Sequence, residues 1–248
     1  MNLKAVLFDL DNTLISFDEI VFFKEYMKKL FVHFADLMTV EDFTNKLLFS
    51  TFVMVENNGK QPNVDSFMES FGNEINADKN DVLQRFIYFY EKDFKQFKPL
   101  MTPIENTYDV LYYTQQKGLK TVIATNPMFP MNVQEYRINW AGLDNLSFDL
   151  ITSADNTSFC KPNLDYYRDI CEKINVSPGN CLMVGNDSFN DMIASKIGMK
   201  TYLTTDSEYI SIELSRLLAQ KVDLEMPSPD YKGSLSGLTA VIDSLIQT

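Results

Sequence analysis

The segment that decides the fold is Lys4-Ala5-Val6-Leu7-Phe8-Asp9-Leu10-Asp11-Asn12-Thr13, in which an apolar run leads into a polar cluster. Short apolar runs of this kind are typical of central parallel strands, which are buried on both faces. Residues two apart on extended backbone point the same way, so the carboxylates of Asp9 and Asp11 face one spot. Such a pair suits a division of labour between an ionised nucleophile and a proton donor. The alternative interpretation is a solvated turn.

Four more short apolar runs are predicted to be strands, at residues 120–124, 148–151, 180–184 and 200–203. Helical patterns lie between and beside them, at residues 103–117, 132–141, 163–175 and 189–197. Three of these patterns stop at a glycine (Gly118, Gly142 or Gly198), which is the expected end of a helix. Alternating strands and helices of this length predict an α/β fold with a Rossmann-like open parallel sheet.

Residues 15–98 have a different texture, because they are rich in Phe and show no strand alternation. Thr39 followed by Asp42 indicates the start of a helix, and Asn58-Gly59 indicates a turn. Apolar residues recur at helical spacing in two places and predict buried helix faces. They are Phe23, Met27, Leu30, Phe31 and Phe34, and then Leu83, Phe86, Ile87, Tyr90, Phe94 and Phe97.

We therefore expect two domains, an α/β catalytic core of residues 1–14 and 99–248 and an inserted all-helical cap of residues 15–98, with about four helices. The segment 223–233 contains two prolines and a glycine, and we expect it to form a surface loop before a last helix.

The chain of 248 residues carries 22 Lys and Arg against 34 Asp and Glu, which gives a formal net charge of −12. This balance argues against a nucleic-acid partner and a polybasic membrane anchor, since both need clustered basic residues. No apolar stretch approaches the roughly 18 residues that a membrane span needs. Asp9 and Asp11 interrupt the N-terminal apolar run, so no signal peptide is expected. Three scattered cysteines predict neither a disulfide framework nor a zinc site. We expect a cytoplasmic monomer or weak dimer.

Three further polar clusters accompany the predicted strands. Thr125-Asn126 ends the second strand and offers a hydroxyl and backbone N–H groups to an anion. Lys161 precedes a helix start, where the helix dipole prefers an anion, so a bound anion would remove the conflict. The segment Gly185-Asn186-Asp187-Ser188-Phe189-Asn190-Asp191 carries carboxylates and amides that suit Mg²⁺. Each cluster taken alone is equally well explained as a cap, a turn or a surface lysine.

All four clusters lie at or beyond the carboxyl ends of predicted parallel strands, the edge where open α/β sheets bind ligands. An acid pair, a hydroxyl, a lysine and a second acid cluster match a phosphoryl-transfer site. With Asp9-x-Asp11-x-Thr13, Thr125, Lys161 and the acidic loop 185–191 in this order, the sequence resembles the haloacid dehalogenase-like superfamily of hydrolases. The helical insert after the first motif is similar to that superfamily's first-type helical cap.

The resemblance implies a role for each residue of the first three motifs. Asp9 would attack phosphorus and form an aspartyl-phosphate, and Asp11 would protonate the leaving alcohol and then activate water. Thr125 and Lys161 would hold the phosphoryl oxygens, with Lys161 also balancing the charge of Asp9. Thr13 and Asn126 are further candidates for binding the phosphate.

The resemblance also implies a Mg²⁺ ion bound by Asp9, the backbone carbonyl of Asp11 and a carboxylate of the last motif. Many members have Gly-Asp followed by a second acid four or five positions later, whereas Asn186 follows Gly185 here. Asp187 and Asp191 keep a four-residue spacing, so we expect Asp187 to bind the metal and Asp191 to support it or orient Lys161. Asn186 is the alternative metal ligand.

The function that this reasoning favours is a Mg²⁺-dependent phosphatase acting on a small phosphorylated metabolite. A dehalogenase of the same fold needs no general acid, and that branch of the superfamily lacks Asp11 and the metal cluster. A phosphomutase would use the same residues and stays open as an alternative. A phosphorylation-switched receiver module also gathers Asp, Thr and Lys around Mg²⁺, but it needs no lid such as residues 15–98.

A few other residues attract attention by their position. Phe17 and Asp18 lie at the start of the insert and are candidates for contact with a substrate. His33 lies among apolar residues and is expected to be a packed or surface residue rather than a ligand. The cysteines are expected to be small buried hydrophobes. Cys160 adjoins Lys161, a neighbour that can lower the pKa of its thiol.

Overall fold

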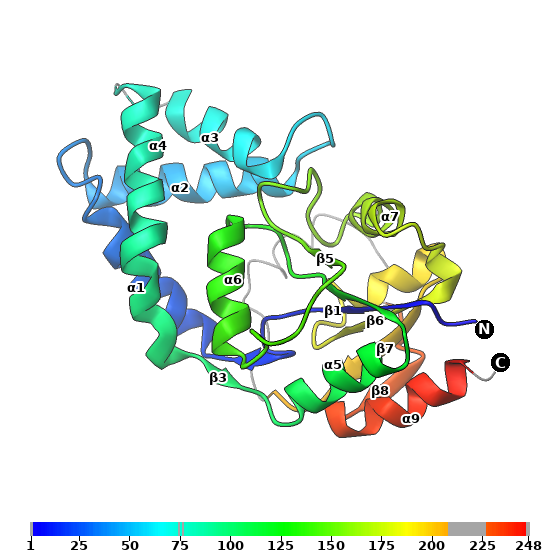
Figure 1. Cartoon of the computed structure of the whole chain (residues 1–248). Coiled ribbons are helices and arrows are strands. Elements are labelled where there is room, and N and C mark those ends of the chain that lie inside the picture. The colour runs from blue at the N-terminus through cyan, green and yellow to red at the C-terminus, as the bar shows by residue number, and fades with distance from the viewer. Residues whose placement is uncertain (1, 74, 76, 208–226, 247–248) are drawn as a thin grey trace.

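Six parallel strands form one sheet in the order β5-β4-β1-β6-β7-β8 (Figure 1). They are β1 (Ala5–Phe8), β4 (Lys120–Ile123), β5 (Leu150–Ile151), β6 (Cys181–Gly185), β7 (Lys200–Thr204) and β8 (Tyr231–Gly233). The computed structural model describes residues 2–73, 75, 77–207 and 227–246. The five predicted strands and the parallel α/β sheet are confirmed.

Side chains of β1 alternate between the two faces of the sheet, and each face is covered by helices. Ala5 and Leu7 belong to a buried cluster with α7 (Leu164–Lys173) and η4 (Met192–Ile197). Val6 and Phe8 belong to a second cluster on the opposite face. The helices of that second face are α5 (Thr107–Gln116), α6 (Met131–Trp140) and α9 (Leu235–Ile246). The result is the three-layer arrangement expected for a Rossmann-like core.

Two expectations about the C-terminal half were wrong in part. The predicted helix at residues 189–197 is a short 3₁₀-helix, η4, that begins only at Met192. A turn precedes it, in which the Asp187 carboxylate accepts the backbone N–H groups of Phe189 and Asn190. The expected loop at residues 223–233 ends in the edge strand β8, which pairs with β7. Residues 223–226 of that loop lie outside the described residues.

The segment between β1 and α5 contains four α-helices: α1 (Glu19–Phe31), α2 (Val40–Val55), α3 (Asn63–Asn73) and α4 (Lys79–Tyr88). A π-helical turn η1 (Phe89–Asp93) and a 3₁₀-helix η2 (Phe94–Leu100) follow α4. The antiparallel strands β2 (Ile15–Ser16) and β3 (Thr102–Pro103) bring the two ends of the segment together. Thr39 caps α2 by accepting the N–H of Asp42, as predicted.

The predicted buried faces are confirmed in part, since Leu30, Phe34, Phe86, Phe94 and Phe97 are buried as expected, while other positions are shifted by one residue. Phe22, Tyr26 and Leu30 are the buried residues of α1, whereas Phe23 is 38% exposed. In the second pattern Phe86 is buried, as predicted, but Ile87 is 37% exposed. The reason is that neighbouring apolar residues satisfy the same helical period, so tertiary packing selects the face.

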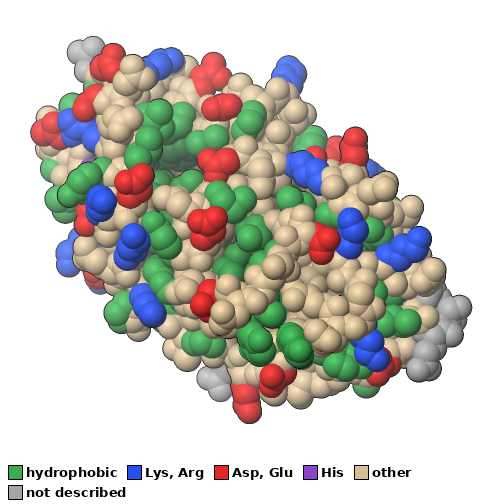
Figure 2. Space-filling view, viewed as in Figure 1, with side chains coloured by type: hydrophobic (Ala, Val, Ile, Leu, Met, Phe, Trp, Pro, Cys, Tyr) green, Lys and Arg blue, Asp and Glu red, His purple; other side chains and the backbone are tan. Residues whose placement is uncertain are grey.

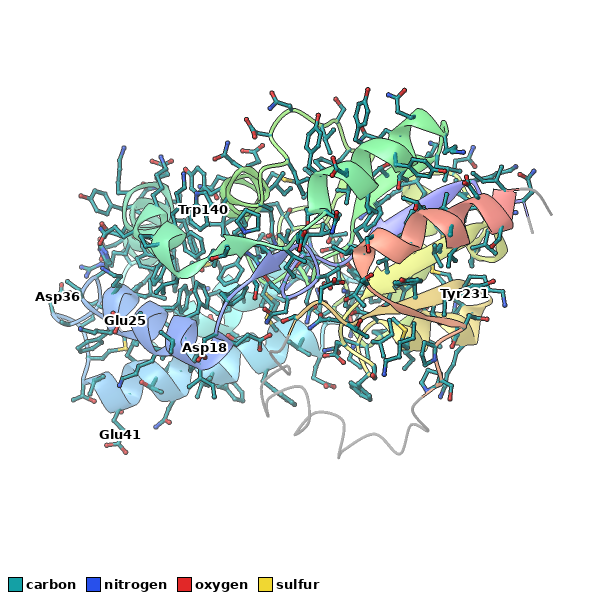
Figure 3. All side chains as sticks on the ribbon, turned by 90° about the horizontal axis from the view of Figure 1, so that it is seen from below. Asp18, Glu25, Asp36, Glu41, Trp140 and Tyr231 are labelled. Atoms are coloured by element: carbon teal, nitrogen blue, oxygen red, sulfur yellow. The ribbon has the colours of Figure 1, made fainter. Side chains whose placement is uncertain are left out.

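An aromatic interface joins the insert (residues 15–98) to α6. The ring of Trp140 stacks on Phe94 with a centroid distance of 5.9 Å, and Phe129 contacts Phe22, Tyr26 and Phe94. In Figure 3, Trp140 lies where α6 meets the helices of the insert, while Tyr231 lies far away on β8. Because these rings belong to one buried cluster, the insert and the sheet share a continuous hydrophobic core.

One face of the molecule shows how its charged side chains are distributed. Figure 2 shows Asp and Glu side chains scattered over this face with Lys and Arg between them. Hydrophobic side chains surround a hollow in the upper part of the same view. A cavity of about 350 Å³ lies between the insert and the loops of the core, and its lining includes Phe67, Phe86, Tyr90 and Met128. In the described part of the chain, every helix is too short or too polar to cross a membrane.

Candidate active site

The register of the sheet aligns three strand ends. Phe8 of β1 lies opposite Ile123 of β4 on one side and Val184 of β6 on the other. The next residue, Asp9, continues this pairing, because its N–H donates to the carbonyl of Val184 at 2.8 Å. The loops that follow β1, β4 and β6 therefore begin at one edge of the sheet, where ligands of open α/β sheets bind.

Lys161 lies between two carboxylates at this edge. Its Nζ donates to Asp9 Oδ1 at 2.8 Å and to Asp191 Oδ1 at 2.6 Å. The three residues are 2%, 7% and 1% exposed respectively, so these charges have little contact with water. Burial opposes the charged form of Lys161, but Asp191 and Asp9 outweigh it and hold the pKa of Lys161 well above its usual value. Burial raises the pKa of Asp191, and the positive charge of Lys161 opposes that rise.

Thr125 presents a free hydroxyl from a fixed loop. Its backbone carbonyl accepts hydrogen bonds from Tyr166 at 2.8 Å and from the Thr152 hydroxyl at 2.7 Å. Its own Oγ1 is buried and has no hydrogen-bond partner among the residues that the structure describes. The neighbouring Asn126 holds the Lys161 loop, because its Oδ1 accepts the backbone N–H of Lys161 at 3.1 Å. A buried hydroxyl without a partner is costly, and a bound oxyanion would satisfy it.

Thr13 connects Asp9 to the loop after β6. Its hydroxyl lies 3.2 Å from Asp9 Oδ2 and 3.2 Å from Asn186 Oδ1. Asn186 therefore faces the Asp9 carboxylate across a single hydroxyl group. The carboxylate of Asp187 accepts three N–H groups instead, from the backbone of Phe189 and Asn190 and from the Asn190 side chain. Its position is that of a turn cap.

Gly185 leaves space for the carboxylate of Asp191. A Cβ atom at Gly185 would overlap the carboxylate of Asp191, so a side chain there would displace the partner of Lys161. Asp191 is fixed from the other side as well, because its Oδ2 accepts the backbone N–H of Asp187 at 3.1 Å. The glycine is thus required by close approach to a buried charge rather than by its backbone angles.

Asp11 is paired with a residue that the sequence did not suggest. Its carboxylate forms an ion pair with Arg137 of α6, and the Asp11 side chain is 33% exposed while that of Arg137 is 1% exposed. Burial lowers the pKa of Arg137 to about 10, with the charge of Asp9 acting against this, so the guanidinium stays charged at neutral pH. No motif marks Arg137, because only the packing of α6 brings it to the end of β1. Its apolar neighbours in α6 are the one signal that it is buried.

The structure gives the remaining candidates local roles. Asp18 caps α1 by accepting the N–H groups of Ile20 and Val21, and Phe17 is buried against Phe22. His33 contacts the carboxylate of Asp93 at 2.8 Å and is a packed residue, as expected.

All three cysteines are buried and free, as expected. The neighbouring Lys161 does not lower the pKa of the Cys160 thiol, because burial raises it to about 12.

Oxygen donors for a metal ion gather around Asp9. Within the described ranges, no three His, Cys, Asp or Glu side chains are placed to hold a metal ion together. The donors beside the Asp9 carboxylate are instead the amide oxygen of Asn186 and the hydroxyl of Thr13. Carboxylate and amide oxygens are hard ligands that suit Mg²⁺, so the residues present fit such an ion with one carboxylate from the first motif.

Comparisons with known proteins agree with this geometry. A pyrophosphatase PpaX of Bacillus cereus is 23% identical over 249 residues, which covers 99% of each chain, and one of Oceanobacillus iheyensis is 25% identical over 79% of this chain and 80% of its own. Among solved structures, a HAD phosphatase from Thermococcus onnurineus aligns with a TM-score of 0.58 at 18% identity, covering 97% of this chain and 98% of its own. The L-2-haloacid dehalogenase of Xanthobacter autotrophicus aligns with a TM-score of 0.56 at 18% identity, covering 98% and 99%.

These structural likenesses establish the shared fold. The model of one family, described as haloacid dehalogenase-like hydrolase, matches residues 3–197, a range that includes the sheet edge and every candidate residue described above. The chain belongs to the haloacid dehalogenase-like hydrolases.

Proposed function

We propose that this hydrolase is a Mg²⁺-dependent phosphatase that cleaves a small phosphorylated metabolite through an aspartyl-phosphate on Asp9. The observation that carries the proposal is the buried Lys161 ammonium, 2.8 Å from Asp9, next to the unpartnered hydroxyl of Thr125. A cation and a free donor beside a carboxylate suit a phosphoryl group that receives the attack of that carboxylate. The curated relatives named pyrophosphatase support chemistry at phosphorus.

The first half of the reaction uses both aspartates. Asp9 is held by Lys161 and Thr13, and one of its oxygens attacks phosphorus while the bond from phosphorus to the leaving oxygen breaks. Asp11, partly exposed at the same edge, takes up a proton when the dianionic substrate binds and gives that proton to the leaving oxygen. Lys161 and the Thr125 hydroxyl donate hydrogen bonds to the phosphoryl oxygens as negative charge develops on them.

The second half returns the enzyme to its starting state. Asp11, now a carboxylate, accepts a proton from a water molecule, and the resulting hydroxide attacks the phosphorus of the aspartyl-phosphate. The bond from phosphorus to Asp9 breaks, phosphate leaves and the Asp9 carboxylate is restored. The insert, residues 15–98, covers this edge as a cap domain and limits the access of water from bulk solvent.

For the metal, we assign Asp9, the backbone carbonyl of Asp11 and Asn186 as the groups that would hold it. Asn186 is preferred over Asp187 because its oxygen faces Thr13 and Asp9, whereas the Asp187 carboxylate is engaged in capping a turn. Mg²⁺ bound there would offset the negative charge of the carboxylates and of the phosphate. Asp191 holds Lys161 in place. The three buried thiols are compatible with a cytoplasmic protein.

The test is phosphate release from an aryl phosphate in the presence of Mg²⁺ by the wild type and by Asp9→Asn. Loss of the nucleophile is expected to lower the rate by about 10³-fold or more, on the scale seen when catalytic nucleophiles are removed. Asp144→Asn is the matched control, because it makes the same change at an exposed residue and is expected to keep the wild-type rate. A rate within tenfold of the wild type in Asp9→Asn would refute the assignment.

A further inference from the structure

Four polar atoms without a hydrogen-bond partner gather around the candidate site. Among the buried side chains of the described residues, the atoms in this state include Thr125 Oγ1, Asp11 Oδ1, Arg137 Nε and Gln134 Nε2. Asp11 Oδ1 is accounted for by its ion pair with Arg137, and Thr125 by the phosphoryl group proposed above. The donors of Arg137 and Gln134 are left without a role in that chemistry.

Arg137 and Gln134 form one unit on α6. They are 1% and 0% exposed, and Arg137 donates to Gln134 Oε1 at 2.8 Å. The guanidinium lies over the ring of Phe129, 5.5 Å from its centroid, which closes one of its flat faces to water. The opposite end of the pair reaches Asp11, so the unit points to the acid pair rather than into the hydrophobic core.

One partly exposed carboxylate does not explain a buried guanidinium. Arg carries five N–H donors in a planar fork, and here one nitrogen is used for Gln134 and one for Asp11. Nε stays without a partner among the described residues, and so does the amide nitrogen of Gln134. A buried cation with unused donors is expensive unless a ligand completes it. Two buried donors without partners, on side chains that contact each other beside Asp11, indicate a place for an oxyanion.

We propose that Arg137 and Gln134 form a subsite for a second anionic group of the substrate, either a carboxylate or a second phosphoryl group. This inference rests on the proposed phosphatase function and narrows it to phosphate compounds with such a group on the leaving side. The position fits this role because Arg137 contacts Asp11, the residue assigned to protonate the leaving oxygen. A group attached to that oxygen would therefore lie within reach of the guanidinium, which binds carboxylates and phosphates through paired N–H donors.

A pair of matched substrates tests the subsite. The phosphate esters of glycolic acid and of ethylene glycol have the same length, but the first ends in a carboxylate and the second in a neutral hydroxymethyl group. Inorganic pyrophosphate is the third substrate and carries a phosphoryl group as its second anion. The wild type is expected to hydrolyse the acid ester or pyrophosphate with kcat/KM at least tenfold above that for the glycol ester. Whichever anionic substrate is preferred identifies the chemical form that the subsite takes.

Three variants separate binding from structure. Arg137→Met removes the charge with little change in length, Arg137→Lys retains a charge, and Gln134→Met removes the amide donor. Arg168→Met is the matched control, because Arg168 is an exposed residue of α7. We expect Arg137→Met to raise KM for the preferred anionic substrate by about 10- to 100-fold, the size expected for losing charge-assisted hydrogen bonds. Because Arg137 also pairs with Asp11, some loss is expected on every substrate, so the subsite is judged from a ratio. The ratio of kcat/KM for the preferred anionic substrate to kcat/KM for the glycol ester should fall by about tenfold or more in Arg137→Met.

Further results support or overturn the subsite. Partial rescue by Arg137→Lys and a smaller KM increase in Gln134→Met would support it. If the wild type hydrolyses neither anionic substrate better than the glycol ester, the subsite is overturned. An equal loss on the preferred anionic substrate and on the glycol ester in Arg137→Met would also overturn it and make Arg137 a structural partner of Asp11. If the wild type releases no phosphate from an aryl phosphate or from any of the three substrates, the proposed function fails instead.

Discussion

Replacing Lys161 with Met removes a cation that bonds to two buried carboxylates. In the native protein Nζ lies 2.8 Å from Asp9 and 2.6 Å from Asp191, and all three side chains are almost inaccessible to water. Met has nearly the same length and fills the same space, so packing around the site should change little. The consequence of the substitution is therefore electrostatic, because two negative charges are left next to each other in a region of low polarity.

The expected cost follows from these contacts. Each charge-assisted hydrogen bond contributes roughly 1.5–3 kcal/mol, and breaking a buried ion pair by removing one partner costs about 3–5 kcal/mol. The two bonds share one ammonium group and are not additive, so we expect Lys161→Met to lower the free energy of unfolding by about 3–5 kcal/mol at pH 8.

The loss of stability should depend on pH in a definite direction. Burial already raises the pKa of Asp191 above its unfolded value, and Lys161 is the group that opposes this. Without Lys161 the folded-state pKa of Asp191 rises further. A carboxyl group with a raised pKa stabilises the folded state below its unfolded pKa, and this contribution is lost as pH rises through the folded pKa. The loss in free energy of unfolding caused by Lys161→Met should therefore be smaller at pH 5.5 than at pH 8.

Urea unfolding at both pH values, followed by circular dichroism, measures this effect. Lys28→Met is the matched control, because Lys28 is 75% exposed and its contact with Glu25 is 4.0 Å long, so its effect should stay within about 0.5 kcal/mol. A deficit below about 1 kcal/mol for Lys161→Met at pH 8 would refute the reasoning, since it would mean that the buried carboxylates do not need their cation. A deficit that grows at pH 5.5 would contradict the assigned direction.

Three further substitutions probe the rest of the site. Thr125→Val removes a buried hydroxyl that has no hydrogen-bond partner in the described part of the chain. The free energy of unfolding should therefore stay the same or rise slightly, while phosphate release falls by about 10²- to 10³-fold. An unchanged rate would exclude the hydroxyl from the reaction. Asn186→Ala should raise the Mg²⁺ concentration needed for half-maximal activity by about tenfold or more. Asp187→Ala should mainly lower the free energy of unfolding, by about 0.5–2 kcal/mol, because the turn loses its cap. If Asp187→Ala rather than Asn186→Ala raised the Mg²⁺ requirement, Asp187 would be the metal ligand. Gly185→Ala should destabilise the protein by about 1–3 kcal/mol, because its Cβ collides with Asp191, and wild-type thermal stability in this variant would contradict the described packing.

Much of the fold follows from local patterns. The segments at residues 120–124, 180–184 and 200–203 are strands because short apolar runs bounded by turns have few alternatives in an α/β chain. Thr39 caps α2 through its neighbour Asp42, an interaction of residues three apart. The one-residue differences, such as Phe22 rather than Phe23 on the buried face of α1, arise where adjacent apolar residues fit the same period.

The candidate site, like the fold, could be predicted only in part. Lys161, Asp9 and Asp191 were expected to lie together because each follows a strand or precedes a helix at one edge of the sheet, and the observed contacts of 2.8 and 2.6 Å agree. That Asn186 rather than Asp187 faces Thr13 could not be predicted, since both residues stand in one loop and only its backbone path decides which oxygen faces Thr13.

The sequence by itself determined the order of the strands and helices, the Phe-rich insert and the four polar clusters, because these depend on residues close together in the chain. Only the tertiary structure decided which distant groups meet. Arg137 stands in a helix without a recognisable motif, 126 positions after Asp11, and its ion pair exists because α6 packs between the sheet and the insert. The ion pair is important because the guanidinium is buried, and a charge removed from water needs an anionic partner. No local sequence pattern indicates which residue that partner is.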